Sequence, residues 1–565
     1  MTSDVARMAD VLGELEHGER AWAALPLSGR IELLAELQAS VAEHARDWVE
    51  TASSIKQLPP GSPLRGEEWI SGPYPFIASA AALRESLIAL ERGGSPIDGF
   101  AIRQAPGGRV ALRVLPHSLF DRLLFSGFEV DVWMPPGVDA ETVRRRAGLA
   151  QRDPGRTQGI AVVLGAGNIT SIGPLDSLYQ LLADNRVSVL KLNPVTDPLK
   201  PVFERALAPL VDRGFVRIVT GGAEAGGRLI GDPRVSAVHM TGAAATHDAI
   251  VFGTGDEGAA NKAAGRAVLD KPVTSELGGV SPVIVLPGRW SAADLRFQAE
   301  HVATQRLHNS GFNCIASQVL ILSADWEQKE DFLAALRAAF RDAPERAAYY
   351  PGCETRVAGA RASYPAAEAV GSRLLITGLD PQGGDEAAFR QEYFAPVLGV
   401  AELPGAGAGF LRAAVEAANA NLTGTLGANI IAHPSTLSEL GTQLDDAVAA
   451  LRYGTVAINA WTGVGYLTPR ASWGAFPGHT ATDIQSGVGV VHNALLLADP
   501  ERSVVRGPFR PAPRSVAHGE LALSPKPAWF VTNRRAATTG RRLVEFTANP
   551  GWARLPRIFA SALRG

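Results

Sequence analysis

The feature that most narrows the possible fold is a regular alternation of short apolar runs and helical stretches in the middle of the chain. The runs are rich in Val, Ile and Leu, and they cover residues 160–164, 187–192, 216–219 and 235–240. Such runs are typical of strands buried on both faces, and helices between them favour a parallel sheet with right-handed crossovers. The sequence therefore predicts an α/β fold.

Three polar residues stand at the ends of these runs. Asn168 follows the first run, Lys191 lies at the end of the second, and Thr241 follows the fourth. Taken singly, an Asn commonly fills a turn and a Lys at a strand end is usually only solvated. In open parallel sheets, however, nucleotides bind at the carboxyl ends of the strands. We therefore expect these three residues to lie near a bound nucleotide.

Length and composition limit the class of protein. A chain of 565 residues exceeds one ordinary hydrophobic core, so two or three domains are expected. Hydrophobic residues make up 46% and charged residues 20%, as in globular proteins, and the formal net charge of −3 gives no general attraction to nucleic acid. We expect no nucleic-acid partner.

The cysteine content and the lengths of the apolar runs indicate in which cell compartment the protein is expected. The chain has two cysteines, too few for a disulfide framework, and no CxxC or Cys/His cluster, so no metal is predicted. The N-terminal stretch lacks the apolar core of a signal peptide, and no apolar run approaches the roughly 20 residues of a membrane helix. These features predict a cytoplasmic protein with no membrane partner.

Cys314 is the strongest chemical candidate. It follows Gly311, which lets backbone approach a ligand closely, and Glu276 lies upstream in the sequence ELGG. A thiolate can attack a carbonyl, and a carboxylate can then activate water to cleave the resulting thioester. A lone cysteine is more often a small core residue, so the pair by itself leaves both interpretations open.

Six motifs in order resemble those of the aldehyde dehydrogenase superfamily, from about residue 155 to about residue 495. They are GAGN at 165–168, KLNP at 191–194, MTGA at 240–243, ELGG at 276–279, NSGFNCIA at 309–316 and QEYFAP at 391–396. The resemblance implies an aldehyde dehydrogenase-like α/β fold, with a Rossmann-type parallel-sheet cofactor domain, a second α/β catalytic domain and a small oligomerisation element.

The resemblance also implies roles for individual residues. Cys314 would be the nucleophile, Glu276 the general base and Asn168 an oxyanion donor. The implied cofactor is NAD or NADP, and the implied partners are a small-molecule aldehyde and a homodimer or homotetramer. The cofactor-binding residues would be Gly165, Lys191, Thr241, Gly242, Ala243 and Glu392.

Departures from the family pattern keep alternatives open. Ala243 replaces a serine of the phosphate-side turn, His247 replaces a glycine, and Pro194 stands where an acid often contacts the ribose of NAD. The leading hypothesis is oxidation of an aldehyde to a carboxylic acid. Coenzyme A-dependent acylation and a catalytically silent member of the fold are the alternatives. Glu276 argues against acylation, because a thiol needs no water-activating base to resolve a thioester.

The domain prediction follows the motifs. We expect an N-terminal helical region and cofactor domain over 1–275 with oligomerisation strands within 120–150, a catalytic domain over 276–460, and a return to the cofactor and oligomerisation region over 461–500. Residues 501–565 form a basic Pro/Arg-rich extension, with 11 Arg and one Lys against three Glu, a net charge of +9. We expect an extended arm that packs on an acidic surface.

Overall fold

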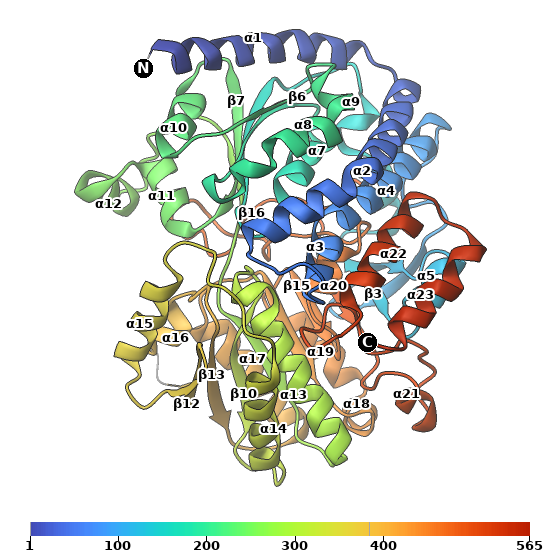
Figure 1. The fold of residues 1–565 in the computed structure, drawn as a ribbon, viewed down its shortest axis with the longest axis vertical. Helices are drawn as coiled ribbons and strands as arrows, with labels where there is room; N and C mark the ends of the chain where they lie inside the picture. Colours follow the sequence, from blue (N-terminus) through green and yellow to red (C-terminus); the bar gives the residue numbers. More distant parts are fainter. Residues whose placement is uncertain (1, 383–384) are drawn as a thin grey trace.

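Two sheets organise the computed structural model, which describes residues 2–382 and 385–565 (Figure 1). The smaller sheet has six strands in the order β16-β8-β7-β4-β5-β6. All neighbouring strands are parallel except β16, which runs antiparallel to β8. Its strands are β4 (Ile160–Leu164), β5 (Val187–Lys191), β6 (Val216–Val219), β7 (Val235–Gly242), β8 (Val273–Leu277) and β16 (Gly487–Val488). The four predicted runs are thus neighbouring strands of one parallel sheet.

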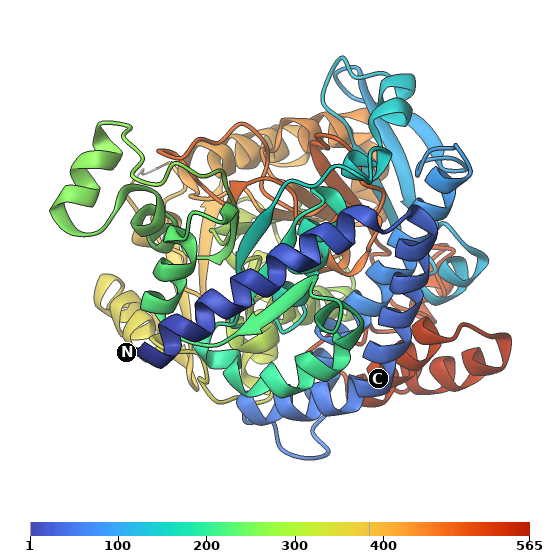
Figure 2. The same cartoon turned by 90° about the horizontal axis from the view of Figure 1, so that it is seen from above.

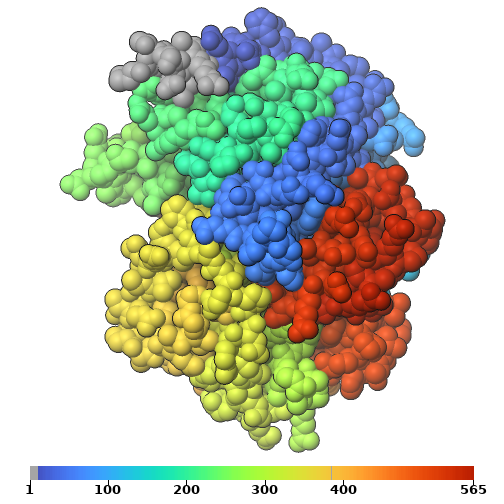
Figure 3. All heavy atoms as spheres, in the orientation of Figure 1, coloured from blue at the N-terminus to red at the C-terminus, as the bar shows by residue number. Residues whose placement is uncertain are grey.

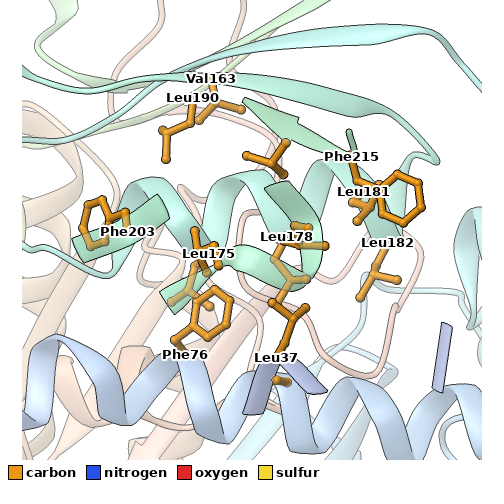
Figure 4. Close-up of a cluster of buried hydrophobic side chains, with 14 of the residues drawn as sticks. Leu37, Phe76, Val163, Leu175, Leu178, Leu181, Leu182, Leu190, Phe203 and Phe215 are labelled. Carbon is orange, nitrogen blue, oxygen red and sulfur yellow. The ribbon is translucent and has the colours of Figure 1, made fainter. Parts of the chain in front are cut away.

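Helices pack on both faces of this sheet and bury its strands. On one side, α7 (Ile172–Ala183) returns the chain from β4 to β5, and α2 (Leu27–Ile55) and α4 (Pro73–Glu91) pack outside it. Figure 4 shows Leu175 and Leu178 of α7 between the strand residues Val163 and Leu190 and Leu37 of α2. The helix α1 (Thr2–Ala24) crosses the top of the molecule (Figure 2).

The remaining helices of this half connect its strands or extend from them. They are η2 (Pro194–Leu199), α8 (Lys200–Ala206), α9 (Ala208–Val211), α10 (Ala223–Gly231), α11 (Ala244–Phe252) and α12 (Gly255–Ala263). Residues 199–211 have one continuous helical pattern in the sequence, but in the structure most of them lie in the two short helices α8 and α9. Pro201 and Pro209 lie in the first turns of α8 and α9, where a missing backbone N–H costs little.

The larger sheet has eleven strands in the order β1-β2-β3-β17-β15-β14-β9-β10-β13-β12-β11. The run from β17 to β12 is parallel, and both edges are antiparallel. The bounds are β1 (Ala101–Ala105), β2 (Arg109–Leu115), β3 (Glu129–Trp133), β9 (Ser281–Val285), β10 (Ser317–Ser323), β11 (Glu368–Val370), β12 (Arg373–Leu379), β13 (Val397–Leu403), β14 (Gly427–Ile431), β15 (Thr455–Ile458) and β17 (Arg502–Arg506).

Helices also flank this sheet. They include α13 (Ala292–Leu307), α14 (Lys329–Asp342), α15 (Cys353–Ser363), α16 (Ala387–Arg390), α17 (Gly407–Asn421), α18 (Pro434–Leu440), α19 (Thr442–Ala450) and α20 (Gly463–Leu467). Together the two sheets confirm the predicted α/β class with parallel sheets.

The basic C-terminal segment is not an extended arm, and that expectation is wrong. Its first residues form β17, inserted between β3 and β15, so this strand completes the large sheet. The segment later forms α21 (Arg514–Ala517), α22 (Ala536–Ala548) and α23 (Leu555–Ala562). Composition alone suggested irregular structure because the prolines cluster near residues 508–513. An acidic contact does exist, since Arg510 and Arg514 both bind Asp294 at the start of α13.

The C-terminal helix α22 packs against the helices α3 (Arg65–Ser71) and α4 from the N-terminal part of the chain. It crosses α3 at two glycines, Gly66 and Gly540. A Cβ on Gly66 would lie 2.4 Å from the backbone of Ala536, so only glycine permits this approach. Figure 3 shows the C-terminal segment in red directly beside the N-terminal helices in blue. Among the described residues, no helix combines the length and the apolar character that crossing a bilayer requires.

Candidate active site

Cys314 lies in a small cavity between the two sheets, at the end of a strained turn. The turn η3 (His308–Gly311) follows α13, and its residues Asn309 and Ser310 have φ angles of 53° and 58°, in the left-handed region. The cavity has a volume of about 50 Å³. Its walls include Glu276, Asn313, Trp461, Tyr466 and Trp473. The structure thus brings the predicted nucleophile and the predicted base into one site.

Glu276 lies near the end of β8, opposite Thr241 of β7 in the register of the sheet. Its carboxylate is buried and lies within hydrogen-bonding reach of the Cys314 thiol and the Trp473 indole. Burial raises the pKa of Glu276 to about 7, and the charge of Asp176 adds to the effect, while the contact with Cys314 opposes it. A carboxylate with this pKa can accept a proton near neutral pH.

The Cys314 thiol is held in its neutral form. Burial raises its pKa well above the usual value, and the nearby Glu276 carboxylate raises it further. Its own backbone N–H points to the sulfur and acts in the opposite direction. A preformed thiolate is therefore disfavoured in this cavity.

Asn168 lies between β4 and α7, and its side chain reaches the nucleophile turn. Its amide nitrogen donates a hydrogen bond of 2.9 Å to the backbone carbonyl of Phe312, two residues before Cys314. An amide group carries two N–H donors, so the second hydrogen remains for another acceptor. The Asn309 amide in turn donates to the backbone carbonyls of Asn168 and Phe312. The two asparagines therefore join the first strand of the small sheet to the turn.

A buried carboxylate that sequence reasoning missed supports the same turn. Glu67 on α3 accepts a hydrogen bond of 3.0 Å from the backbone N–H of Asn309 and pairs with Arg346 at 2.7 Å. Burial opposes the charge of Glu67, yet Arg346 and His308 hold its pKa below the usual value. Glu67 lies more than 240 positions from Asn309 in the chain. No local signal in the sequence links the two.

The predicted ribose-binding lysine lies at the carboxyl end of β5. Lys191 is buried, and its backbone carbonyl accepts a hydrogen bond of 3.0 Å from Gly165. Burial lowers the pKa of Lys191, and the charge of Asp197 in η2 opposes this. Asp197 is a second residue that the sequence reasoning missed. It stands six positions after Lys191, and one of its oxygens is buried without a hydrogen-bond partner.

The phosphate-side turn connects β7 to α11. Gly242 ends β7, and Ala243 is the capping residue of α11, which has no side-chain cap. The Thr241 hydroxyl donates a 3.2 Å hydrogen bond to Asp176, so it is used inside the protein. His247 is buried under the helix against Phe252 and bonds Asp248. Its bulk points inward, so the backbone N–H groups at the start of α11 stay accessible.

Glu392 packs against the turn that follows Glu276. It accepts a hydrogen bond from the backbone N–H of Gly279, and a Cβ on Gly278 would lie 2.1 Å from its carboxylate. Burial raises the pKa of Glu392 to about 8, although Arg306 opposes the effect. Its charge also acts on Cys314. Glu392 therefore lies near enough to Cys314 to act on its pKa, and the glycine at 278 makes room for it.

A group of buried polar side chains lies behind the base. His239 faces Asp176 at 3.4 Å, and the Tyr466 and His492 rings lie with centroids 4.6 Å apart and planes tilted by 46°. Neither nitrogen of His492 has a hydrogen-bond partner, and burial lowers its pKa to about 4. Within residues 2–382 and 385–565, no group of three or more His, Cys, Asp or Glu side chains is arranged to hold a metal ion.

Comparisons with known proteins agree with this geometry. The model of the aldehyde dehydrogenase family matches residues 149–351, which include Asn168, Lys191, Glu276 and Cys314. A succinate-semialdehyde dehydrogenase [NADP(+)] 1 from Mycobacterium tuberculosis (strain ATCC 25618 / H37Rv) is 30% identical over 267 residues, 43% of this chain and 51% of the relative. The chain thus matches about half the length of that relative.

Solved structures extend the likeness over most of the chain. A gamma-glutamyl-gamma-aminobutyraldehyde dehydrogenase from Burkholderia cenocepacia J2315 has a TM-score of 0.58 at 20% identity, covering 88% of each chain. An NADP-dependent glyceraldehyde-3-phosphate dehydrogenase from Bacillus halodurans C-125, complexed with NADP, has a TM-score of 0.57 at 16% identity, covering 88% of this chain and 91% of that one. An indole-3-acetaldehyde dehydrogenase complexed with NAD+ has a TM-score of 0.56 at 16% identity, covering 88% of each chain.

Because these solved structures are at most 20% identical to the chain, their similarity shows the fold alone. Residues 149–351 thus match the aldehyde dehydrogenase family, and most of the chain has the fold of the solved aldehyde dehydrogenases.

Proposed function

We propose that the protein oxidises an aldehyde to a carboxylic acid with NAD or NADP, using Cys314 as the nucleophile and Glu276 as the base. The observation that carries the proposal is the contact between the Glu276 carboxylate and the Cys314 thiol in a buried cavity. The family contributes the reaction class, and the geometry contributes the pairing of a neutral thiol with a carboxylate of raised pKa.

The residues at the carboxyl ends of the small sheet fit a dinucleotide. The uncapped N-terminus of α11 offers backbone N–H groups to a pyrophosphate, and Gly165, Gly242 and Ala243 leave the approach open. Lys191 would face a ribose, and Glu392 has a buried oxygen without a partner for another ribose hydroxyl. When bound, the nicotinamide supplies the acceptor for the hydride that leaves the aldehyde carbon.

The chain's own groups perform the other steps. Glu276 accepts the thiol proton while the Cys314 sulfur bonds to the aldehyde carbon, and the carbonyl oxygen becomes an oxyanion. The Cys314 backbone N–H and the second N–H of Asn168 would stabilise that oxyanion. After hydride loss, the acyl group is a thioester on Cys314. Glu276, having released the thiol proton to solvent, takes a proton from water as the water oxygen attacks, and it passes this proton to the sulfur as the carboxylic acid leaves, which restores the thiol.

Two alternatives make different predictions. If coenzyme A resolved the thioester, Glu276 would be needed only to accept the thiol proton, and activation of water, which the buried carboxylate beside the sulfur could perform, would have no use. A silent member of the fold would have no need for a neutral thiol, a carboxylate of raised pKa and a supported turn in one cavity. Both alternatives are separated from the proposal by the product that is formed.

The substrate of the matched mycobacterial relative is not carried over. An aldehyde that bears a carboxylate needs a cation near the nucleophile. Among the described residues that line the cavity at Cys314, none is Lys or Arg. The walls are mainly aliphatic and aromatic, and Glu276 is the only carboxylate among the described wall residues. The cavity therefore favours an uncharged aldehyde.

The test measures reduced nicotinamide and carboxylic acid together. Purified enzyme is incubated with NAD or NADP and uncharged aldehydes, with and without coenzyme A, in isotopically labelled water. We expect acid that carries one labelled oxygen and is formed without coenzyme A. An acyl-coenzyme A product, or no reduction of either cofactor with any aldehyde, would contradict the proposal. A cytoplasmic location and a homodimer or homotetramer stay predictions, to be tested by fractionation and by mass in solution.

A further inference from the structure

A second and much larger cavity lies beside the catalytic one. Its volume is about 530 Å³, within the range of about 300 to 1,000 Å³ that is typical of ligand sites. Its walls come from α3, α4, α5 (Leu119–Leu124), α20, α22 and α23, together with residues 523–529. Apolar side chains dominate these walls, including Tyr74, Phe120, Leu123, Leu543, Phe546 and Phe559. We refer to this cavity as the apolar chamber.

The apolar chamber adjoins the cavity that holds Cys314. Three residues, Ile70, Leu467 and Trp529, line both cavities. Trp529 packs on the hydrophobic cluster around Cys314 and also on the cluster that includes Val464 of the chamber wall. Since the same side chains face both spaces, a linear ligand that passes them would have one end in the chamber and the other at the thiol.

The charged residues of the chamber already have partners in the protein. Arg470 pairs with Glu85, and Lys526 pairs with Glu300 at 3.4 Å. Asp121 accepts hydrogen bonds from the backbone N–H groups of His117 and Ser118 at the start of α5. These groups are engaged in internal contacts, so the chamber offers a ligand mainly apolar surface. An anionic ligand would find no uncommitted cation among the described wall residues.

We infer that the apolar chamber holds the hydrocarbon tail of the substrate, so the protein acts on aldehydes with long or bulky apolar chains. The inference rests on the proposed function, because it places the carbonyl end at Cys314. The catalytic cavity alone, at about 50 Å³, has room for little more than the reacting group. A larger aldehyde needs a second space, and the apolar chamber is the space whose walls continue from the first.

The test is the dependence of kcat/KM on chain length for straight-chain aldehydes from propanal to dodecanal. Each buried methylene contributes about 0.8 kcal/mol, which corresponds to a rise in kcat/KM of about fourfold per carbon until the chamber is filled. A flat series, or a fall with length, would overturn the inference while propanal turnover keeps the proposed function intact.

A variant with a bulky side chain in the apolar chamber tests whether the hydrocarbon tail of the substrate lies there. Ala81 on α4 is half-buried and lines the apolar chamber, so Ala81→Phe places a ring in that space. We expect kcat/KM for dodecanal to fall by at least about tenfold, with propanal within about twofold of wild type. The matched control is Ala420→Phe at an exposed position of α17, far from either cavity lining, which should change neither value. Unchanged propanal turnover shows that Ala81→Phe is folded.

A binding measurement covers the case in which no aldehyde is oxidised. Dodecan-1-ol has the same tail and cannot react at the thiol, and its binding is followed by calorimetry. Binding to wild type that Ala81→Phe abolishes and Ala420→Phe retains would support the chamber as a tail site even if the proposed function failed. Absence of binding, or equal binding by the two variants, would overturn the inference.

Discussion

The two cavities of this protein differ in size, chemistry and origin along the chain. The catalytic cavity is small and is built around Cys314 and Glu276, mostly from residues between 169 and 473, with Ile70, Ser71 and Trp529 completing its walls. The apolar chamber is about ten times larger and is built mostly from residues before 130 and after 460. The difference teaches that, if the proposed function holds, the reacting groups come mainly from the middle of the chain and the proposed tail site comes from its two outer parts.

The largest expected effect is on the catalytic cavity alone. Cys314→Ala removes the nucleophile, and we expect kcat to fall by at least about 10⁴-fold for every aldehyde. Binding of dodecan-1-ol should be unchanged, since the apolar chamber is intact. Steady-state rates and calorimetry on the same preparation check both statements. Residual turnover within about tenfold of wild type would remove Cys314 from the chemistry.

The base gives the next effect and a pH dependence. Because the pKa of Glu276 is raised to about 7, the proton-accepting form is scarce at pH 5 to 6 and dominates above pH 8. We expect kcat/KM to rise with pH through about 7. Glu276→Gln should lower kcat by about 10² to 10⁴-fold and remove this rise. An unchanged pH profile in Glu276→Gln would show that another group is the base.

A substitution where α22 packs on α3 should affect the apolar chamber more than the catalytic cavity. A Cβ on Gly540 would lie 2.9 Å from Trp69 and 3.2 Å from the backbone of Gly66, so Gly540→Val pushes α22 from α3. We expect kcat/KM for dodecanal to fall by about tenfold, with propanal little changed, and a stability loss of about 1 to 3 kcal/mol.

The matched control for this substitution is Gly359→Val in α15. No atom lies within 4 Å of a Cβ built on Gly359. Chemical unfolding and the same two substrates are measured for both variants. Equal losses on propanal and dodecanal in Gly540→Val would mean that the packing of α22 on α3 supports the whole enzyme rather than the chamber.

The smallest effect concerns the cofactor side. Asp197 stands beside Lys191 with an unpartnered buried oxygen, and an acid near an adenosine ribose accepts a hydrogen bond from the 2′-hydroxyl of NAD and repels the 2′-phosphate of NADP. We expect NAD to bind more tightly than NADP. Asp197→Ser should narrow the difference by about fivefold to tenfold in Kd, measured by calorimetry without aldehyde. A wild-type preference for NADP would contradict this.

The strands of the small sheet could be predicted because each is a local apolar run bounded by turns. The runs at 160–164 and 216–219 coincide with β4 and β6. The edges of the large sheet could not be predicted in this way. Strand β17 lies between β3 and β15, and the pairing of residues about 370 positions apart leaves no local signature. The C-terminal helices were missed because nearby prolines and arginines suggested irregular structure.

The candidate site shows the same division. The motifs identified Cys314, Glu276 and Asn168, since those residue types suit nucleophile, base and donor. They did not indicate Glu67, whose bond to the backbone of Asn309 joins α3 to the nucleophile turn. Nor did they indicate Asp197, because the acid was sought three positions after Lys191 and stands six positions after it. The roles of the motif residues stay predictions until the substitutions are measured.

The sequence by itself indicated the α/β class, the resemblance to aldehyde dehydrogenases and the residue types available for catalysis, because these depend on local patterns of apolar and polar side chains. Only the tertiary structure decided that the Cys314 thiol is held neutral, that the pKa of Glu276 is raised, and that the chain ends enclose the apolar chamber. Burial and cavity shape depend on which distant segments pack together, and that packing is a property of the whole folded chain.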